Sequence, residues 1–186
     1  MMKFRIHQPY STPSQALSAL SRREDAIAAT EFALVLPFLL LLIMGVIELS
    51  NVMTVERRLL NSVQSTADLI SQETDVTSAD MSEIFTAAKL TLSPFSIVGF
   101  GVGTTSVRFN DTSGVPFVDW SHGLNGGTVA DPLIKADGRG EPGDSVIIVT
   151  GTYTYEPLLS MIIPNNIILT ETSYARPRKV RWVLKH

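Results

Sequence analysis

The most pronounced feature of the hydrophobic pattern is an apolar run near the amino end of the chain. From Ala26 to Ile47 almost every residue is apolar, and only Thr30 and Glu31 interrupt the run. About 22 residues are enough to cross a hydrocarbon core of about 30 Å at 1.5 Å rise per residue. A cleaved secretory signal would have a shorter apolar region followed by a small-residue cleavage site, and no such site follows here. The pattern therefore predicts one membrane-spanning helix.

The helical pattern continues beyond the apolar run. Apolar residues recur at spacings of three and four, while charged and amide side chains take the other face, and no Gly or Pro lies between Val46 and Gln72. We expect one helix over residues 27–72, transmembrane to about residue 49 and amphipathic beyond it. The apolar stripe of the second half comprises Val52, Val55, Leu59, Val63, Ala67 and Ile70. This stripe should pack against the rest of the chain.

Residues 73–186 have the pattern of a small sheet with one extra helix. Asp80 and Glu83 have the spacing of a capping box, which predicts a short helix over Asp80–Leu92. Beyond it, β-branched and aromatic residues broken by turn residues predict strands at Ile97–Phe109, Pro116–Ser121, Ser145–Tyr155 and Ile167–Tyr174. Their hairpin-length links indicate an antiparallel sheet laid on the outer half of the long helix. The expected fold class is therefore α+β.

Residues 1–26 are expected to form a cytoplasmic leader or tail. The first 21 are rich in Ser, Pro and Gln and show no sustained periodicity, which is typical of a disordered segment. Basic residues are more numerous before the apolar run than just after it, which favours a cytoplasmic amino end and an exported carboxyl-terminal domain. They are Lys3, Arg5, Arg22 and Arg23 before the run, and Arg57 and Arg58 after it.

Composition narrows the range of functions. The chain has 186 residues and a net charge of -3, and its Lys and Arg residues are not massed as on a phosphate-binding face. The absence of Cys excludes a disulfide framework, a thiol nucleophile and a thiolate metal site. The histidines lie in separate segments, so no Ser-His-Asp arrangement can be assembled from the pattern. We therefore expect no enzyme activity, no cofactor, no metal ion and no nucleic-acid partner.

The apolar run and its surroundings also resemble a known family. A basic pair with acids, then small residues, then TEFALVLPFLLLLIMGVIELS is similar to the TadE-like minor pilins (pseudopilins) of the tight-adherence (Tad/Flp) type IV pilus system of bacteria. GDSVIIVTGTYTYEPL and ILTETSYARPR resemble the closing strands of that family, so the resemblance extends over roughly residues 22–178. It implies a pilin-like fold and a minor pilin or pilus assembly component.

The resemblance further implies a location and partners. The chain would be a single-pass inner-membrane protein with a cytoplasmic amino end and a periplasmic domain, and the extracellular pilus would be a second location. Its partners would be other pilin or pseudopilin subunits, the pilus assembly machinery and the lipid bilayer. Type IV prepilins are also cut on the cytoplasmic side by a prepilin peptidase, usually after Gly and five residues ahead of a glutamate. Placed on this chain, that rule puts the cut between Ala26 and Ile27, with Ala where Gly is usual.

The charge inside the apolar run acquires a role if that cut is made. The new amino terminus at Ile27 would need a partner among apolar helices, and Glu31 of a neighbouring subunit would supply it and set the helix register. An unpaired charge in hydrocarbon costs several kcal/mol, so such pairing would favour transfer of a subunit from lipid into a filament. The residues expected to pack against other pilin helices are Phe32, Leu36, Pro37, Leu40 and Gly45.

Other interpretations of the same residues stay open at this stage. Glu31 and Glu48 could mark the two ends of a short span, with both carboxylates among the lipid headgroups. The alternative function is an unprocessed, membrane-tethered periplasmic binding module that keeps residues 1–26. The acidic loop DGRGEPGD is interpreted as a solvated turn rather than a calcium site. The basic carboxyl-terminal segment YARPRKVRWVLKH is interpreted as a solvated strand edge protected by its charges.

Overall fold

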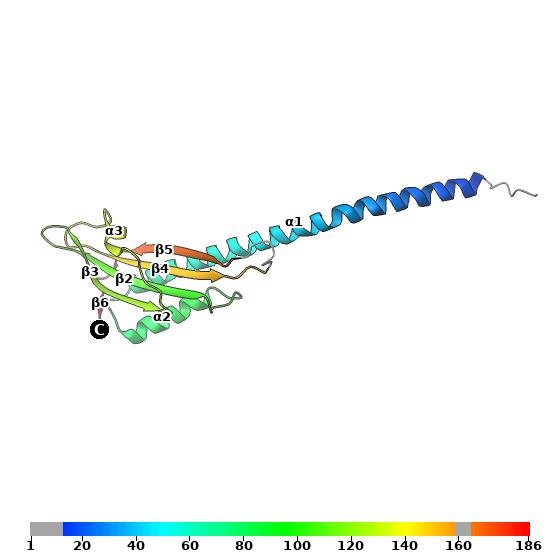
Figure 1. Cartoon of the computed structure of the whole chain (residues 1–186). Coiled ribbons are helices and arrows are strands. Elements are labelled where there is room, and N and C mark those ends of the chain that lie inside the picture. Colours follow the sequence, from blue (N-terminus) through cyan, green and yellow to red (C-terminus); the bar gives the residue numbers. More distant parts are fainter. Residues whose placement is uncertain (1–12, 159–164) are drawn as a thin grey trace, which may run out of the picture. The chain divides into compact units, whose positions relative to one another are not determined.

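The computed structural model describes residues 13–158 and 165–186, with side chains in the first helix described from Ile27 onward. The chain divides into two units, Met1–Val46 and Ile47–His186. Helix α1 (Pro13–Ser71) contributes to both units (Figure 1). Its end lies one residue before the predicted end, but its start lies well before residue 27. The prediction of disorder is therefore wrong for residues 13–21, while residues 1–12 lie outside the described part of the chain.

The early start of α1 has a local explanation. Pro13 occupies the first helical position, where the missing N–H costs nothing and the fixed φ angle suits a helix. The residues that follow are mainly Ala, Leu, Gln, Ser, Arg and Glu, most of which have high helix propensity. Hydrophobic periodicity does not reveal this segment, because a helix that is polar on most sides shows little periodicity.

The second unit contains the remaining helices and strands. They are β1 (Asp75–Val76), α2 (Ser78–Leu90), β2 (Phe100–Phe109), β3 (Pro116–Leu124), α3 (Pro132–Ala136), β4 (Ser145–Tyr155), β5 (Ile167–Ala175) and β6 (Leu184–Lys185). The extra helix and the strands β2 to β5 were predicted, with bounds within three residues of those observed. The elements β1, α3 and β6 were not, because two to five residues are too short to show a period.

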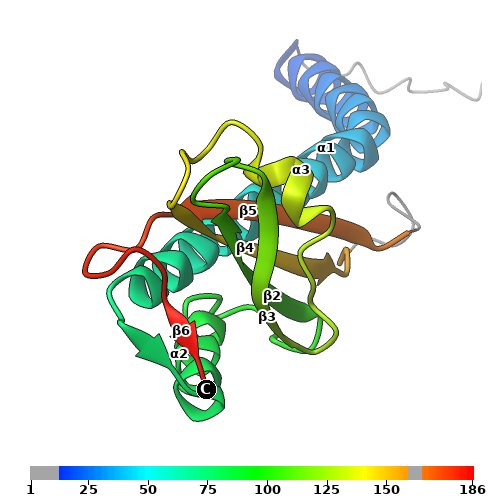
Figure 2. The ribbon, with the colours of Figure 1, turned by 90° about the vertical axis from the view of Figure 1, so that its left-hand side faces the viewer.

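The main sheet is antiparallel throughout, as predicted. Its strand order is β3-β2-β4-β5, and the pairing of β2 with β3 shifts between Ser106 and Val107, where Asp119 of β3 has no partner in β2 and is the extra residue of a bulge. A separate pair of short parallel strands joins β1 to β6, so the carboxyl end of the chain lies beside the segment that follows α1 (Figure 2). The fold of the chain is therefore α+β, with a long amino-terminal helix, a small antiparallel sheet and a short extra helix.

The capping box of α2 lies one turn earlier than predicted. Thr77 is the N-cap, and its hydroxyl accepts from the Asp80 amide at 3.2 Å while the Asp80 carboxylate accepts from the Thr77 amide at 2.8 Å. The predicted pair of Asp80 and Glu83 was therefore wrong, although its spacing was that of a capping box. The hydrogen bonds from the backbone and the side chain of Thr77 lower the pKa of Asp80. Thr77 and Asp80 thus satisfy each other's backbone amides, which is the reciprocal arrangement of a capping box.

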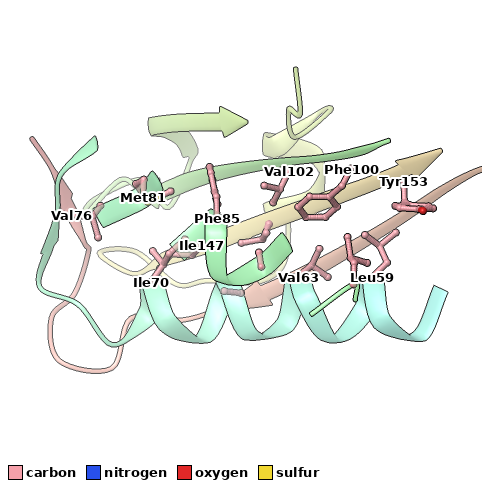
Figure 3. Close-up of a cluster of buried hydrophobic side chains, with 14 of the residues drawn as sticks. Leu59, Val63, Ile70, Val76, Met81, Phe85, Phe100, Val102, Ile147 and Tyr153 are labelled. Carbon is pink, nitrogen blue, oxygen red and sulfur yellow. The ribbon is translucent and has the colours of Figure 1, made fainter. Parts of the chain in front are cut away.

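The core of the second unit forms where both helices pack on one face of the sheet. Five of the six residues predicted to form the apolar stripe on α1, Val55, Leu59, Val63, Ala67 and Ile70, are each at 0% exposure, and Val52 is partly buried. They belong to one cluster with Phe85 of α2, Phe100 of β2 and Tyr153 of β4 (Figure 3). A smaller cluster on the other face of the sheet joins Ala136 of α3 to Val107 and Ile148. The amphipathic half of α1 therefore holds the sheet, as its period indicated.

Gly151 of β4 lets α1 approach the sheet closely, which gives a test of this packing. A Cβ atom there would lie 2.5 Å from Cγ1 of Val63 and 3.0 Å from Cδ1 of Leu59. We expect Gly151→Ala to lower the free energy of unfolding by about 1–3 kcal/mol, the range typical of an overpacked core. Denaturant unfolding of the full chain in detergent measures this. Thr152→Ala, one residue further along the strand, is the control and should have a smaller effect.

A compensating change separates overpacking from other causes. Val63→Ala removes the side chain that the new methyl group would meet, so the double variant Gly151→Ala/Val63→Ala should lose less stability than the two single variants together. Strict additivity would show that Gly151 is not needed for the approach of α1.

Candidate functional site

Residues 27–46 of α1 present an apolar surface with almost nothing over it. Within the part of α1 from Ile27 to Ser71, an 18-residue stretch has a mean hydropathy of 2.7, and 6% of that stretch is buried. Phe32 is 61% exposed, Leu34 73% and Phe38 72%. Apolar side chains at this exposure would each cost about 1.5–3 kcal/mol relative to burial if they faced water. The length and composition of this segment therefore support single-pass anchoring in a membrane.

Glu31 is the one charged residue between Ile27 and Ile47. Its side chain is exposed, and none of the side chains that the structure describes forms a hydrogen bond or an ion pair with it. One turn of helix separates it from Ile27, whose carbonyl oxygen accepts from Oγ1 of Thr30 at 2.7 Å. Ala26 is also helical, but its side chain lies outside the described atoms. The peptide bond between Ala26 and Ile27 is therefore inside α1.

The five residues predicted to pack against other helices do not share one face of α1. At about 100° per residue, Phe32, Leu36 and Leu40 lie along one side of the helix. Pro37 lies beside that stripe, and the helix continues through it. Gly45 lies on roughly the opposite side, and a Cβ atom added there would meet nothing within 4 Å. The helix thus offers a stripe of large side chains and, elsewhere, a small-residue position.

Glu48 is a site that the sequence interpretation missed. Its side chain is 3% exposed, and its Oε1 accepts from the Tyr155 hydroxyl at 2.8 Å and from the Leu158 amide at 3.1 Å. The carboxylate is therefore enclosed by protein rather than by lipid headgroups, and that expectation was wrong. These bonds tie the beginning of the second unit to the end of β4. The sequence gives only a weak indication of this contact, since a Tyr at the end of a strand can equally pack in the core or face solvent.

The environment of this pair alters the acidity of the tyrosine. Burial and, next, the hydrogen bond to Glu48 raise the pKa of Tyr155 from 10.0 to about 12. Between pH 10.0 and about 12, the Tyr155 hydroxyl therefore keeps its proton in the folded chain and loses it in the unfolded chain. Because the unfolded state binds fewer protons there, stability falls as the pH rises from about 10 to about 12.

We expect the contribution of Tyr155 to this alkaline loss to be about 2–3 kcal/mol, at about 1.4 kcal/mol per pKa unit. The measurement is the free energy of unfolding from pH 8 up to about pH 12, in the wild-type chain and in Tyr155→Phe. The wild-type curve should fall more steeply with pH than that of the variant. Parallel curves would mean that Tyr155 titrates near its ordinary pKa in the folded chain.

The basic carboxyl-terminal segment packs against the domain instead of forming only a solvated strand edge. Val183 is fully buried, and its carbonyl oxygen accepts from Nε1 of Trp120 at 2.8 Å. Arg178 forms an ion pair with Asp68 near the end of α1, and its amide donates to the carbonyl of Ser71 at 2.9 Å. The expectation of an edge protected by charges was therefore incomplete. The apolar residues between the charges, Val180 and Val183, were the signal for packing.

The His, Asp and Glu side chains that could serve as metal ligands or catalytic groups are dispersed in the described part of the structure. In residues 27–158 and 165–186, no three or more His, Asp or Glu side chains come together in a way that could hold a metal ion. In the acidic loop, Oδ2 of Asp144 accepts from the Glu141 amide at 3.2 Å and lies 3.6 Å from Nη1 of Arg176. His122 stacks on Phe85 with ring centroids 5.7 Å apart, and burial followed by the charge of Lys185 lowers its pKa. These contacts give the groups structural partners.

Comparison with known proteins finds a family that part of α1 resembles. Residues 26–68 match the family model described as TadE-like protein, which confirms the resemblance drawn from the sequence. The match begins at Ala26 and includes Glu31, the exposed apolar surface and most of the amphipathic half of α1. The strands that also resemble the family lie outside it. No curated protein and no solved structure matches the chain.

Proposed function

We propose that the chain, which carries this TadE-like segment in α1, is a minor pilin or assembly component of a bacterial tight-adherence pilus. The observation that carries the proposal is the match over residues 26–68. This segment includes the proposed cleavage position, Glu31 and the exposed apolar surface of the anchoring helix together. The TadE-like family supports a structural role in a pilus system and not an enzymatic one.

The proposed location follows from the anchoring helix and the basic residues. Residues 27–46 would cross the inner membrane, with the amino end in the cytoplasm and the second unit in the periplasm. The excess of Arg and Lys ahead of the apolar run supports this orientation. Incorporation into a fibre would carry the same unit to the cell exterior.

The proposed mechanism is helix packing guided by one charge. A prepilin peptidase would cut between Ala26 and Ile27, and since this bond lies inside α1 the helix must first open locally at that point. The new ammonium group of one subunit would then pair with Glu31 of a neighbour. The stripe of Phe32, Leu36 and Leu40 would contact one neighbouring helix, while Gly45 allows close approach on the other side.

The proposal is tested by asking whether the chain contacts pilins and whether pili need it. The chain has no Cys, so Leu36→Cys provides a unique crosslinking position on the helix, and Ile134→Cys is a matched control that is exposed on α3. We expect Leu36→Cys to crosslink to cysteine-bearing pilin helices in the membrane, Ile134→Cys not to do so, and deletion of the chain to abolish or strongly reduce piliation. Normal piliation without the chain and no crosslinks at position 36 would favour the unprocessed, tethered binding module instead.

A further inference from the structure

Exposed apolar side chains gather at one end of the second unit. Val98 is 89% exposed, Leu158 75% and Ile168 72%. They come from different segments that meet where β4 ends: the amide of Thr154 donates to the carbonyl of Gly99 at 3.0 Å, and Tyr155 pairs with Ile167 across β4 and β5. The three side chains therefore surround the end of one strand.

This end is also the end that holds the first residues of the unit. The Glu48 carboxylate accepts from the Leu158 amide at 3.1 Å and from the hydroxyl of Tyr155 at 2.8 Å. Leu49 and Met53, which follow on α1, are 61% and 46% exposed. In Figure 3, Leu59, Phe100 and Tyr153 lie toward this end of the core, and Val76 and Met81 lie toward the other.

Chain continuity places this end next to the apolar run of α1. The apolar run of the membrane span ends at Ile47, directly before Glu48 in the chain. The residues hydrogen-bonded to Glu48, Tyr155 and Leu158, therefore lie beside the point in the chain at which the apolar run ends. The boundary between headgroups and acyl chains receives apolar side chains to a depth of about 5–10 Å.

We propose that this end of the second unit docks on the surface of the bilayer in which α1 is anchored, with Val98 and Leu158 inserted among the acyl-chain ends. We call Leu49, Met53, Val98, Leu158 and Ile168 the membrane-proximal surface. The bonds of Glu48 to Tyr155 and Leu158 fix this surface to the beginning of the unit. The proposal requires the anchoring helix but not the pilus role, so it stands or falls separately from the proposed function.

The charges nearby are compatible with a lipid surface. Arg57 is exposed on α1, one turn beyond Met53, and its long apolar stem allows its guanidinium to reach lipid phosphates. Arg58 has partners in the protein, since its guanidinium donates to the carbonyls of Thr91 and Ser93. Glu56 and Glu156 are exposed and would face water beside the headgroups.

The test uses the full chain in vesicles of phosphatidylcholine and phosphatidylglycerol. A nitroxide is attached to single cysteines at Val98, Leu158 and Ile134, and its collisions with oxygen, which concentrates in hydrocarbon, are compared with those of a water-soluble nickel chelate. Ile134 is the matched control, because it is 76% exposed on α3, whose Ala136 packs near Val146 at the opposite end of β4. A label at Phe38, inside the span, gives the reference for hydrocarbon.

We expect the ratio of oxygen to nickel collisions at Val98 and Leu158 to exceed that at Ile134 several-fold and to approach that at Phe38. Ratios equal to that at Ile134 would place the surface in water and overturn the proposal. Low accessibility to both reagents would show a protein partner over the surface and would overturn it as well. If either cysteine variant does not fold, Met53→Cys and Ile168→Cys report on the same surface. A Phe38 label in water would instead contradict the anchoring itself.

Discussion

Replacing Glu31 by alanine is expected to leave membrane insertion intact while strongly reducing the amount of the protein found with pili. The variant removes the only charge in the apolar segment, so insertion becomes easier rather than harder. In the proposed filament it leaves the amino terminus of a neighbour without a partner. A charge at the centre of a membrane helix costs about 2.5–3.5 kcal/mol, and the amino terminus lies at the end of the span, so roughly a hundredfold is the upper bound on the expected loss of incorporation.

Conservative variants and a second carboxylate make this prediction specific. Glu31→Asp keeps the charge and should retain more incorporation than Glu31→Gln, which keeps the shape but not the charge. Glu56→Ala removes an exposed carboxylate further along the same helix and should leave incorporation unchanged. The quantity to measure is the ratio of the protein in sheared pili to that in membranes, by immunoblot. Equal ratios for Glu31→Ala and wild type would remove the charge from the mechanism.

Replacing Glu48 by leucine is expected to destabilise the second unit by about 2–3 kcal/mol. The change leaves the hydroxyl of Tyr155, a residue that is 5% exposed, without its acceptor. It also removes the acceptor of the Leu158 amide. A buried donor without a partner costs about 1–3 kcal/mol, and the more exposed amide adds less because water can reach it. Denaturant unfolding of the full chain in detergent, followed by the fluorescence of Trp120 and Trp182, measures the effect.

A double-mutant cycle tests the pair directly. Tyr155→Phe alone leaves the buried carboxylate with one donor fewer, whereas Glu48→Leu/Tyr155→Phe removes both members of the bond. The double variant should therefore be less destabilised than the sum of the single variants, with a coupling of about 0.5–3 kcal/mol. Glu56→Leu, at an exposed position of the same helix, is the control for replacing a carboxylate on α1. Additive effects would show that the bond contributes little to stability.

The sequence predicts the parts of the fold that repeat. The stripe from Val55 to Ile70 is completely buried because a spacing of three and four residues defines one face of any α-helix. The strands β2 to β5 are long enough for alternation and flanking turn residues to identify them. The membrane span is equally clear, since its length and apolar character are set by the bilayer itself.

The features that the sequence does not predict depend on single contacts across the fold. Glu48 and Tyr155 are far apart in the chain, and only the folded structure shows that a carboxylate beside an apolar run meets a hydroxyl at a strand end. The strands β1 and β6 are two residues long and form because the carboxyl end returns to the end of α1. The capping box of α2 shows a further limit. The pair Thr77 and Asp80 and the pair Asp80 and Glu83 have the same spacing, and only the structure shows that the first pair forms the box.

The central claim, that the chain follows the pilin pathway, is tested most directly by its intact mass and amino-terminal sequence. The protein is recovered from membranes of a host with its prepilin peptidase and of the same host without it. The account predicts a mature chain that begins at Ile27 when the peptidase is present and an uncut chain when it is absent. A chain that keeps residues 1–26 in both hosts would contradict the account and would leave Glu31 without an amino terminus to pair with.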